Sequence, residues 1–284
     1  MEPLVSVYIT TFNRVELLKR AVDSVLQQSY KNIELFVADD GSTDATHEYL
    51  VDMEKKGLLT AIINKGASKG ACFGRNKAIA LAAGEFITGL DDDDYLQAWR
   101  IATFIENWSV LEKSAEGLTN VAGLFDSMIE KMVDKEYRTH ESKKVTYCQL
   151  RTSNPIGNQI FTKLDYIKSI NGFDEDMPAL QDWDTWIRLS RQYGIFINVN
   201  SFSYIVDAAH GEARISEKKA TKIRQAFTLL ETKLSPLKLS EKIKLTDTMF
   251  GYQQMNLHVK NFIILLLGGR FRRLAQVVKR TFLK

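Results

Sequence analysis

The chain has 284 residues, of which 45% are hydrophobic, 38 are Lys or Arg and 35 are Asp or Glu, so its formal net charge is only +3. This composition excludes a disordered chain, supplies a core for one large α/β domain with a C-terminal appendage, and is too weakly basic to indicate nucleic-acid binding. The two cysteines, Cys72 and Cys148, form neither a disulfide framework nor a metal-ligand spacing, which favours a reduced cytoplasmic protein.

The first 95 residues alternate short apolar runs with amphipathic stretches. Strands are expected at Leu4–Ile9, Ile33–Ala38, Leu58–Ile63 and Glu85–Leu90, and helices at residues 15–28, 44–55 and 71–83. This β-α-β-α-β-α-β order predicts a Rossmann-like α/β fold, with a mostly parallel central sheet and helices on both faces.

The rest of the chain is predicted to be more helical. Helices are expected at residues 95–112, 160–170 and 182–193, a strand at Ile195–Val199, and a mostly helical segment from Ser216 onward with a break at Pro236. Residues 118–150 fit strands and a helix equally well. These patterns divide the chain into an α/β domain of residues 1–215 and a helical extension of residues 216–284.

Neither a secretory signal nor a membrane-spanning segment is expected. The N-terminus runs directly into a strand-like segment, without the basic and apolar regions of a signal peptide. The longest apolar run, Phe262–Leu267, is far shorter than the roughly 20 residues that cross a bilayer.

Polar loops follow the four predicted strands, at Thr10–Arg14, Asp39–Asp44, Asn64–Gly70 and Asp91–Asp94. In open α/β sheets, ligands bind beyond the carboxyl ends of the strands. The sequence therefore predicts that these loops converge on one binding site.

The acidic run Asp91–Asp94 is the strongest local signal. Four adjacent carboxylates at a strand end repel one another, and a hard divalent cation such as Mg²⁺ or Mn²⁺ relieves that repulsion while it binds substrate phosphates. The alternative is a solvated acidic turn in which Asp93 or Asp94 caps the next helix. Four consecutive acids directly after an apolar strand favour the metal site.

Two further segments carry carboxylates. Asp39 and Asp40 begin a turn that either caps the following helix or accepts hydrogen bonds from a nucleobase or ribose. Asp182 begins a helix with Trp183 and Trp186; it either interacts with the positive end of that helix or acts as a general base beside aromatic walls. The two Trp residues are more typical of a core than of a ligand platform.

Taken in order, these segments resemble the GT-A glycosyltransferases of glycosyltransferase family 2. The resemblance covers about residues 4–194 and rests on Ser6–Arg14, Ala38–Asp44, Gly74–Ala78 with Ala83–Ile87, Leu90–Asp94, Gly172–Glu175, and Gln181–Asp184 with Arg188. It implies a GT-A domain whose nucleotide-sugar half is about residues 1–95 and whose acceptor half is about residues 96–215. Each motif alone is weak, whereas the ordered set is specific.

The resemblance also implies roles for single residues. The donor contacts would be Thr10, Phe12, Asn13, Asp39, Asp40, Arg75, Asp91 and Asp92, with Phe12 against the base. Asp93, the last acid of the DxD motif, would bind the metal, Asp182 would be the catalytic base, and His210 is a weaker candidate for a metal or diphosphate contact.

The chain departs from the family pattern at two positions. Thr10 stands where the family often has Pro, and Gln181 stands where it often has Glu. The first change is harmless if the loop binds through its backbone. The second removes a negative charge beside Asp182 and favours the ionised form of that carboxylate, or else signals altered acceptor contacts.

The activity that the resemblance implies is a single displacement with inversion, which converts an α-linked donor into a β-linked product. The donor would be a nucleotide-diphosphate sugar, with UDP favoured over GDP and dTDP, and the cofactor Mn²⁺ or Mg²⁺. The acceptor would be a glycan or a polyprenyl-linked glycan in bacterial surface-polysaccharide synthesis, such as O-antigen, lipopolysaccharide or capsule. The expected location is the cytoplasm, peripheral to the inner face of the cell membrane.

Residues 260–284 are basic and amphipathic and contain no acid. This segment fits a helix packed on the catalytic domain, a monotopic contact with an anionic membrane, or a homodimer contact.

Three other classes of protein share parts of the pattern. A metal-dependent phosphohydrolase would explain the acidic run but not the Asp182 segment, and a noncatalytic carbohydrate-binding module would not need both. A nucleotidyltransferase is the nearest structural alternative, but no glycine-rich phosphate loop lies near residue 10.

Overall fold

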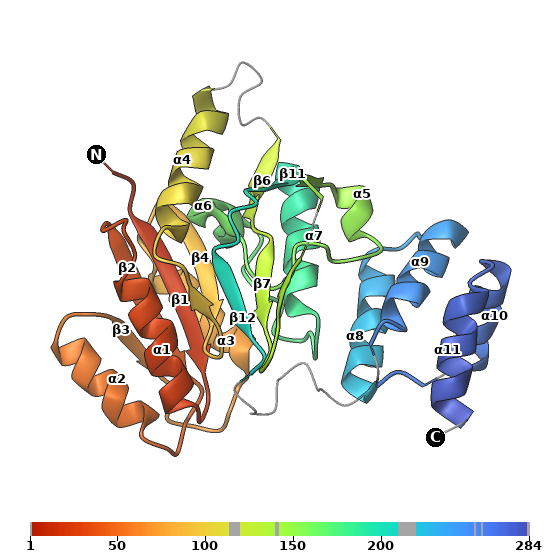
Figure 1. Ribbon diagram of the computed structural model, residues 1–284, viewed down its shortest axis with the longest axis horizontal. Helices are drawn as coiled ribbons and strands as arrows, with labels where there is room; N and C mark the ends of the chain where they lie inside the picture. Colours follow the sequence, from red (N-terminus) through yellow and green to blue (C-terminus); the bar gives the residue numbers. More distant parts are fainter. Residues whose placement is uncertain are drawn as a thin grey trace.

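The computed structural model describes residues 2–113, 120–139, 142–209, 220–252, 254–256 and 258–282. It consists of an α/β body followed by helices at the C-terminal end (Figure 1). His210 and Ser216 lie outside the described residues, as do residues 283 and 284 at the end of the basic tail.

The N-terminal half of the body has the predicted order of elements. These are β1 (Val5–Thr11), α1 (Val15–Leu26), β2 (Ile33–Asp39), α2 (Thr46–Lys55), β3 (Thr60–Ile63), α3 (Ala71–Leu81) and β4 (Phe86–Asp91). Strands β1 to β4 are parallel, with Thr10 of β1 opposite Ala38 of β2 and Asp91 of β4. The prediction for this half is confirmed, and β3 begins two residues later than expected.

The second half is richer in strands than predicted. It contains β5 (Tyr95–Leu96), α4 (Arg100–Lys113), β6 (Val121–Phe125), β7 (Met128–Lys131), β8 (Glu136–Arg138), β9 (Lys144–Val145), α5 (Tyr147–Leu150), β10 (Phe161–Lys163), α6 (Leu164–Ser169), α7 (Gln181–Tyr193), β11 (Ile195–Asn198) and β12 (Tyr204–Asp207). In the described part of the ambiguous segment 118–150, there are four strands and one short helix.

Two predicted helices were wrong at their N-terminal ends. Residues 95–112 begin with β5, which pairs with β12, and the helix starts only at Arg100. Residues 160–170 begin with β10, which lies antiparallel between β4 and β6. The cause in β10 is long-range packing, because the Phe161 ring stacks on Phe86 with the ring centroids 4.9 Å apart.

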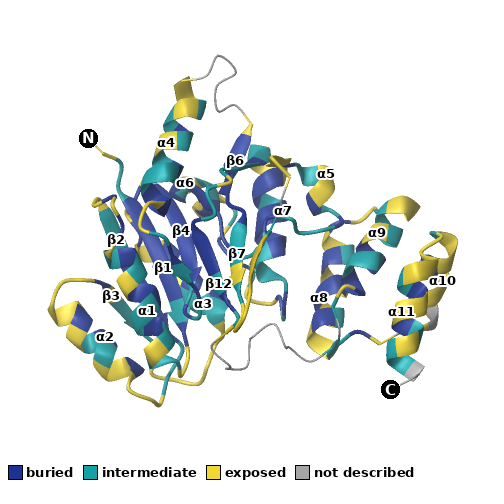
Figure 2. Ribbon diagram, in the orientation of Figure 1, coloured by how far each residue is buried: buried dark blue, intermediate teal, exposed yellow. Residues whose placement is uncertain are grey.

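The main sheet has the order β3-β2-β1-β4-β10-β6-β11-β9, and a smaller sheet has the order β5-β12-β7-β8. One face of the main sheet is covered by α1, α2 and α4, and the other by α3, α6 and α7, so that each face has its own hydrophobic core. Alternation along β1 produces this division, because Val7 and Ile9 enter one core and Tyr8 the other. Strands β1, β2, β4 and β6 are mostly buried, whereas β8 and the outer helix faces are exposed (Figure 2).

The C-terminal extension consists of α8 (Ala220–Lys233), α9 (Leu239–Met249), α10 (Val259–Leu267) and α11 (Phe271–Phe282). Helix α8 shares a core with the body, since the Phe227 ring packs edge-on against Trp183 of α7 with the centroids 5.6 Å apart. The break near Pro236 is confirmed. Across the described ranges, no helix combines the length and the apolar composition that crossing a bilayer requires.

Candidate active site

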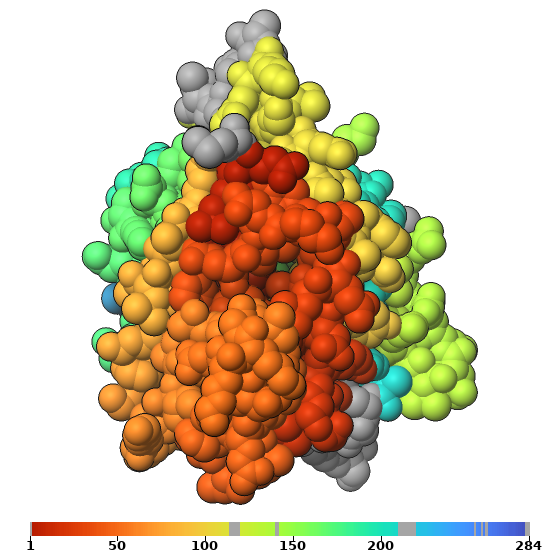
Figure 3. All heavy atoms as spheres, turned by 90° about the vertical axis from the view of Figure 1, so that its left-hand side faces the viewer, coloured from red at the N-terminus to blue at the C-terminus, as the bar shows by residue number. Residues whose placement is uncertain are grey.

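A cleft of about 1450 Å³ lies at the carboxyl ends of β1, β2 and β4. It brings together the four predicted loops and the start of α7. Nearly all the candidate residues line it, namely Thr10, Phe12, Asp39, Asp40, Arg75, Asp91, Asp92, Asp93 and Asp182. The N-terminal segments that carry these loops form the central part of one face of the molecule, red to orange in Figure 3.

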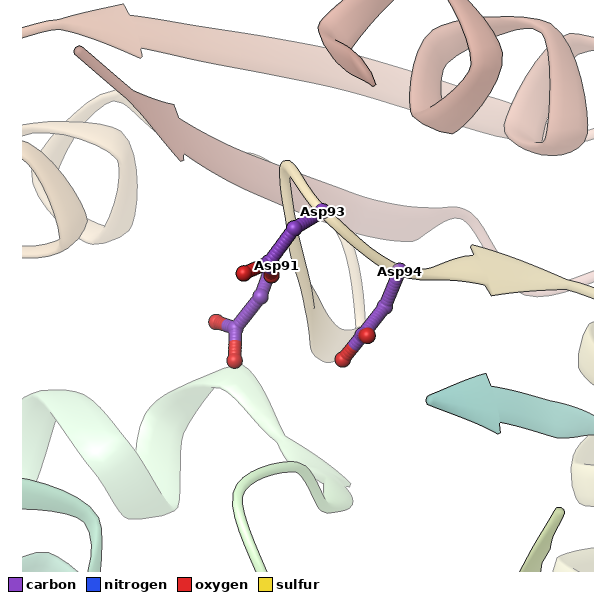
Figure 4. Close-up of side chains that lie close together, drawn as sticks. All are labelled: Asp91, Asp93 and Asp94. Carbon is purple, nitrogen blue, oxygen red and sulfur yellow. The ribbon is translucent and has the colours of Figure 1, made fainter. Parts of the chain in front are cut away.

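The acidic run forms a tight turn after β4. One carboxylate oxygen from each of Asp91, Asp93 and Asp94 lies within 4.8 Å of the others (Figure 4). Burial raises the pKa of Asp94 well above its usual range, and the charges of Asp91 and Asp93 raise it further. Three carboxylates held this close together repel one another. A divalent cation that prefers oxygen ligands would relieve this repulsion, so the three carboxylates fit such a cation.

Asp94 belongs to the acidic run predicted to bind a metal, although no individual role was predicted for it. Its carboxylate accepts hydrogen bonds from the Tyr204 hydroxyl at 2.9 Å and from the Asp207 backbone N–H at 3.1 Å. Both partners lie on β12, more than 100 residues away in sequence. The two hydrogen bonds from β12 hold the Asp94 carboxylate beside those of Asp91 and Asp93, and only the folded structure shows this.

Asp92 is not a member of this cluster. Its carboxylate accepts a hydrogen bond from Arg14 Nη1 at 3.2 Å, and the same nitrogen lies 3.1 Å from Asp93 Oδ2. Burial raises the pKa of Asp92 to about 6, although the Arg14 guanidinium favours the charged form. The sequence predicted Arg14 only as part of the loop after β1. In the structure, Arg14 links that loop to the acidic turn.

Asp39 and Asp40 both order the backbone beside the cleft. Asp39 is buried and its Oδ1 accepts from the Ser42 backbone N–H at 3.0 Å, which closes the turn after β2. Asp40 accepts from Ser68 Oγ at 2.6 Å and from two backbone N–H groups, those of Lys69 and Gly70, at 2.8 Å. Burial alone would raise the pKa of Asp40, but these hydrogen bonds outweigh it and hold the pKa below its usual range.

Phe12 and Asn13 occupy the rim of the donor side. The Phe12 side chain lines the cleft and the residue is 47% exposed, so a ring face is available to a flat ligand. Asn13 is in the left-handed region, with a φ of 54°, and its Oδ1 accepts from the Thr43 backbone N–H at 2.7 Å. The Asn13 side chain thus fastens the first loop to the turn after β2, outside the lining of the cleft.

Arg75 connects the acidic turn to Asp182. Its buried guanidinium donates to Asp182 Oδ1 at 2.7 Å and to Asp91 Oδ1 at 3.2 Å. Burial alone would lower the pKa of Arg75, but the two carboxylates raise it above its ordinary value. The side chain is only 8% exposed, so Arg75 is a fixed positive charge beneath the cleft.

Close packing of α3 sets the position of Arg75. A Cβ atom at Gly74 would lie 2.9 Å from the Ala38 Cβ and 3.2 Å from the Thr10 Cγ2, so α3 approaches β1 and β2 as closely as glycine allows. On the other side, the Arg75 guanidinium lies 5.0 Å from the centroid of the Phe173 ring.

Two amides that the sequence analysis missed complete the surroundings of Asp91. Asn158 Nδ2 donates to Asp91 Oδ2 at 2.8 Å, and Gln159 Nε2 donates to Asp91 Oδ1 at 3.0 Å. They lie just before β10, in a segment that was assigned no role. Asp91 is therefore oriented by amides and by Arg75 together.

With this geometry established, comparisons with known proteins identify the family. The model of the family "Glycosyl transferase family 2" matches residues 6–157, which is more than half of the chain. The chain belongs to glycosyltransferase family 2. It is therefore a glycosyltransferase, and the phosphohydrolase, nucleotidyltransferase and carbohydrate-binding alternatives do not describe it.

Two bacterial relatives are similar in sequence. WcaA of Escherichia coli K12, which is assigned to glycosyl transfer in colanic acid biosynthesis, is 33% identical over 218 residues, covering 75% of this chain and 76% of WcaA. The GalNAc(5)-diNAcBac-PP-undecaprenol beta-1,3-glucosyltransferase of Campylobacter jejuni is 34% identical over 130 residues, covering 45% of this chain and 40% of its own length.

A solved structure shares the fold. The crystal structure of residues 1–349 of S. aureus TarS in complex with UDP-GlcNAc superposes with a TM-score of 0.62 at 16% identity, covering 98% of this chain and 81% of the TarS chain. This likeness confirms the predicted GT-A fold, including its helical C-terminal part.

Proposed function

We propose that the protein transfers a sugar from a UDP-sugar to a lipid-linked glycan, with inversion, to form a β-linkage in surface-polysaccharide synthesis. The observation that carries the proposal is that Arg75 holds Asp182 and Asp91 in one cleft. A candidate base thus lies beside a candidate metal site, which is the arrangement that a direct displacement at a sugar-diphosphate bond needs.

The donor is proposed to occupy the side of the cleft formed by the loops after β1, β2 and β3. Phe12 stacks on the nucleobase, and Asp39 and Asp40 accept hydrogen bonds from the nucleoside. The name of one relative supports UDP, since the UDP-Glc:alpha-D-GlcNAc-diphosphoundecaprenol beta-1,3-glucosyltransferase WfaP of Escherichia coli is 30% identical over 153 residues. Asn13 and Asp92 are proposed to act on the donor indirectly, because their side chains hold Thr43 and Arg14.

A divalent cation, Mn²⁺ or Mg²⁺, is proposed to be held by Asp91, Asp93 and Asp94. When bound, it would neutralise the diphosphate oxygens and stabilise the UDP leaving group. Asp93 was already expected to be a ligand, and the geometry adds Asp94 and extends the role of Asp91. The role suggested for His210 remains a prediction on a residue outside the described chain.

Asp182 is proposed to accept the proton of the acceptor hydroxyl. As the acceptor oxygen forms its bond to C1 of the donor sugar, the bond from C1 to the diphosphate oxygen breaks and UDP leaves with that electron pair. The Asp182 side chain is 24% exposed to the cleft, so an acceptor hydroxyl can reach it. Arg75 Nη1 donates to Asp182 Oδ1 at 2.7 Å and so fixes the orientation of this carboxylate.

The acceptor class is proposed from the relatives. One carries a name that describes transfer to an undecaprenol-diphosphate glycan, and the other is assigned to colanic acid biosynthesis. A lipid-linked acceptor requires the cleft to open near a membrane, so we place the protein at the inner face of the cell membrane.

The outer surface of α10 and α11 is proposed to contact that membrane. Five large apolar side chains are exposed there, which are Phe262, Ile263, Leu266, Leu267 and Phe271. The exposed basic residues Arg270, Arg272 and Lys279 adjoin them, and residues 258–282 contain no acid. Both helices are largely exposed in Figure 2. Apolar side chains rimmed by cations match an anionic lipid surface.

Vesicle binding tests the membrane contact. We expect the protein to sediment with vesicles that contain phosphatidylglycerol and not with pure phosphatidylcholine. Replacing Ile263 and Leu267 together by Ser should abolish sedimentation, whereas Leu239→Ser on α9 should not. A dimer in light scattering that this double substitution dissociates, with no vesicle binding, would instead assign the surface to a homodimer.

The donor proposal is tested by calorimetry with UDP-, GDP- and dTDP-sugars in the presence of Mn²⁺ or Mg²⁺. We expect one UDP-sugar to bind, and only with metal. Binding that is equally tight in EDTA would contradict the metal site, and preference for a GDP- or dTDP-sugar would contradict the nucleotide.

A further inference from the structure

The cleft extends beyond the donor loops onto the C-terminal extension. Its lining includes Lys222 and Ile223 of α8, Thr248 of α9, and Tyr252 just after α9. These residues lie outside the segment that the family model matches, residues 6–157. Asp182 and Trp183 line the same cleft.

Tyr252 is packed into the part of the cleft lining that the C-terminal extension contributes. Its ring packs edge-on against Phe227 with the centroids 5.9 Å apart, and Phe227 in turn packs against Trp183. The row of rings therefore runs from the extension to the residue next to the candidate base. Burial raises the pKa of the Tyr252 hydroxyl, and the negative charge of Asp182 raises it further, which agrees with a position near that carboxylate.

The Tyr252 side chain is only partly buried, and its hydroxyl makes no hydrogen bond to the described part of the chain. A tyrosine fixed by its ring and open at its polar tip is suited to a ligand with both apolar and hydroxyl-bearing faces. A sugar ring is such a ligand. At this place in the cleft, the sugar would be the acceptor, since the ring contacts connect Tyr252 to Trp183, the residue next to the candidate base.

Lys222 supplies a positive charge on the same part of the cleft lining. It is exposed and makes no ion pair with any described residue. A lysine ammonium in this setting binds phosphate as a point charge. An acceptor whose sugar is attached to a lipid through a diphosphate has this charge next to the sugar.

We infer that Tyr252 and Lys222 form an acceptor subsite on the C-terminal extension, where Tyr252 stacks on the acceptor sugar and Lys222 binds the diphosphate that joins it to the lipid. The inference rests on the proposed function and deepens it, because it assigns the acceptor class to named residues. Its basis is that α8, α9 and Asp182 line one cleft.

The test measures acceptor binding directly, by calorimetry on the full chain loaded with UDP and Mn²⁺. The first probe is N-acetylglucosaminyl diphosphate carrying an undecyl chain, and the second is the undecyl glycoside of the same sugar without the diphosphate. Steady-state transfer to both probes is measured alongside.

We expect Tyr252→Ala to weaken both probes about tenfold or more, the loss typical of a buried aromatic anchor. Tyr252→Leu, which keeps apolar volume against Phe227, should show the same loss and so separates stacking from folding. Lys222→Gln should weaken only the diphosphate probe. Lys244→Gln, an exposed lysine of α9 outside the cleft lining, should change neither. The affinity for UDP should stay the same in all variants.

Unchanged binding of both probes by Tyr252→Ala and Tyr252→Leu would overturn the stacking role, and equal losses for both probes with Lys222→Gln would overturn the phosphate role. If the wild-type protein binds UDP but neither probe, the proposed acceptor class is wrong and the proposed donor site is unaffected. Failure to bind any nucleotide-sugar would overturn the proposed function itself.

Discussion

Replacing Asp182 by Asn is the sharpest test of the catalytic assignment, because it removes a charge and nearly preserves the shape. The amide oxygen of the variant can still accept the hydrogen bond that Arg75 donates at 2.7 Å. Asp182 pairs with a buried guanidinium, but Arg75 keeps Asp91 as a second carboxylate partner at 3.2 Å, so losing the charge of Asp182 costs about 1–3 kcal/mol of stability. That corresponds to a fall in melting temperature of about 2–12 °C.

The expected loss of turnover is much larger. A positioned general base contributes about 10²–10⁴-fold to the rate, which is roughly 3–5.5 kcal/mol of transition-state stabilisation. We therefore expect kcat to fall by at least about a hundredfold while the affinity for the donor is unchanged. The gap between the small structural cost and the large kinetic cost identifies chemistry as the cause.

The assay is UDP release under saturating donor and acceptor, with donor affinity measured separately by calorimetry. Asp176→Asn is the matched control, because Asp176 is an exposed carboxylate six residues earlier, outside the cleft lining. Turnover of the Asp182→Asn variant within about threefold of the wild type would refute the base assignment, since general-base loss is far larger. A fall in donor affinity that accounts for the whole effect would assign Asp182 to donor binding instead.

Three further predictions concern the donor side and the joint to the extension. Asp93→Ala should abolish the increase in donor affinity that Mn²⁺ produces, and calorimetry in which the metal still tightens donor binding would contradict this. Phe12→Ala should weaken UDP about tenfold, because stacking of a base on an aromatic ring contributes about 1–3 kcal/mol; an unchanged dissociation constant would contradict stacking. Glu241 accepts from Arg151 Nε at 2.6 Å, and this hydrogen bond lowers the pKa of Glu241 to about 2. The pair therefore stabilises the fold above about pH 4.5, and this contribution is lost as the pH falls toward about 2. Glu241→Gln should lower the melting temperature at pH 7 by about 2–4 °C and remove part of the acid dependence, whereas parallel melting curves from pH 7 to pH 3 would refute it.

Local pattern was enough to predict the donor half of the fold. Strands β1, β2 and β4 are rich in apolar residues because parallel strands are buried on both faces. The helix α7 was predicted from its periodic apolar face. By contrast, Phe161–Lys163 is a strand only because β4 and β6 lie on either side of it. A three-residue strand that leads directly into a helix leaves no periodic signal of its own.

The site shows the same division between local and long-range information. The carboxylates of the acidic run were visible in the sequence, but the turn geometry decides that Asp94 joins the cluster and that Asp92 points to Arg14. The amides of Asn158 and Gln159 reach Asp91 across nearly 70 residues of sequence, and no motif marks them. Residue type predicted the chemistry, while long-range packing determined which members of each group take part.

The proposed function divides the reaction between the body and the extension. The candidate donor, metal and base residues all lie in the body, whereas α8 and α9 contribute Lys222, Ile223 and Thr248 to the lining of the same cleft. Arg151 fastens the extension to the body, because its guanidinium binds Glu241 and the backbone carbonyls of Leu234 and Pro236. Loosening this joint should therefore weaken acceptor binding while donor binding is kept. For the Glu241→Gln variant, we expect a higher KM for the acceptor and an unchanged dissociation constant for UDP. Equal losses in acceptor and UDP binding would show instead that the body and the extension act as one rigid unit.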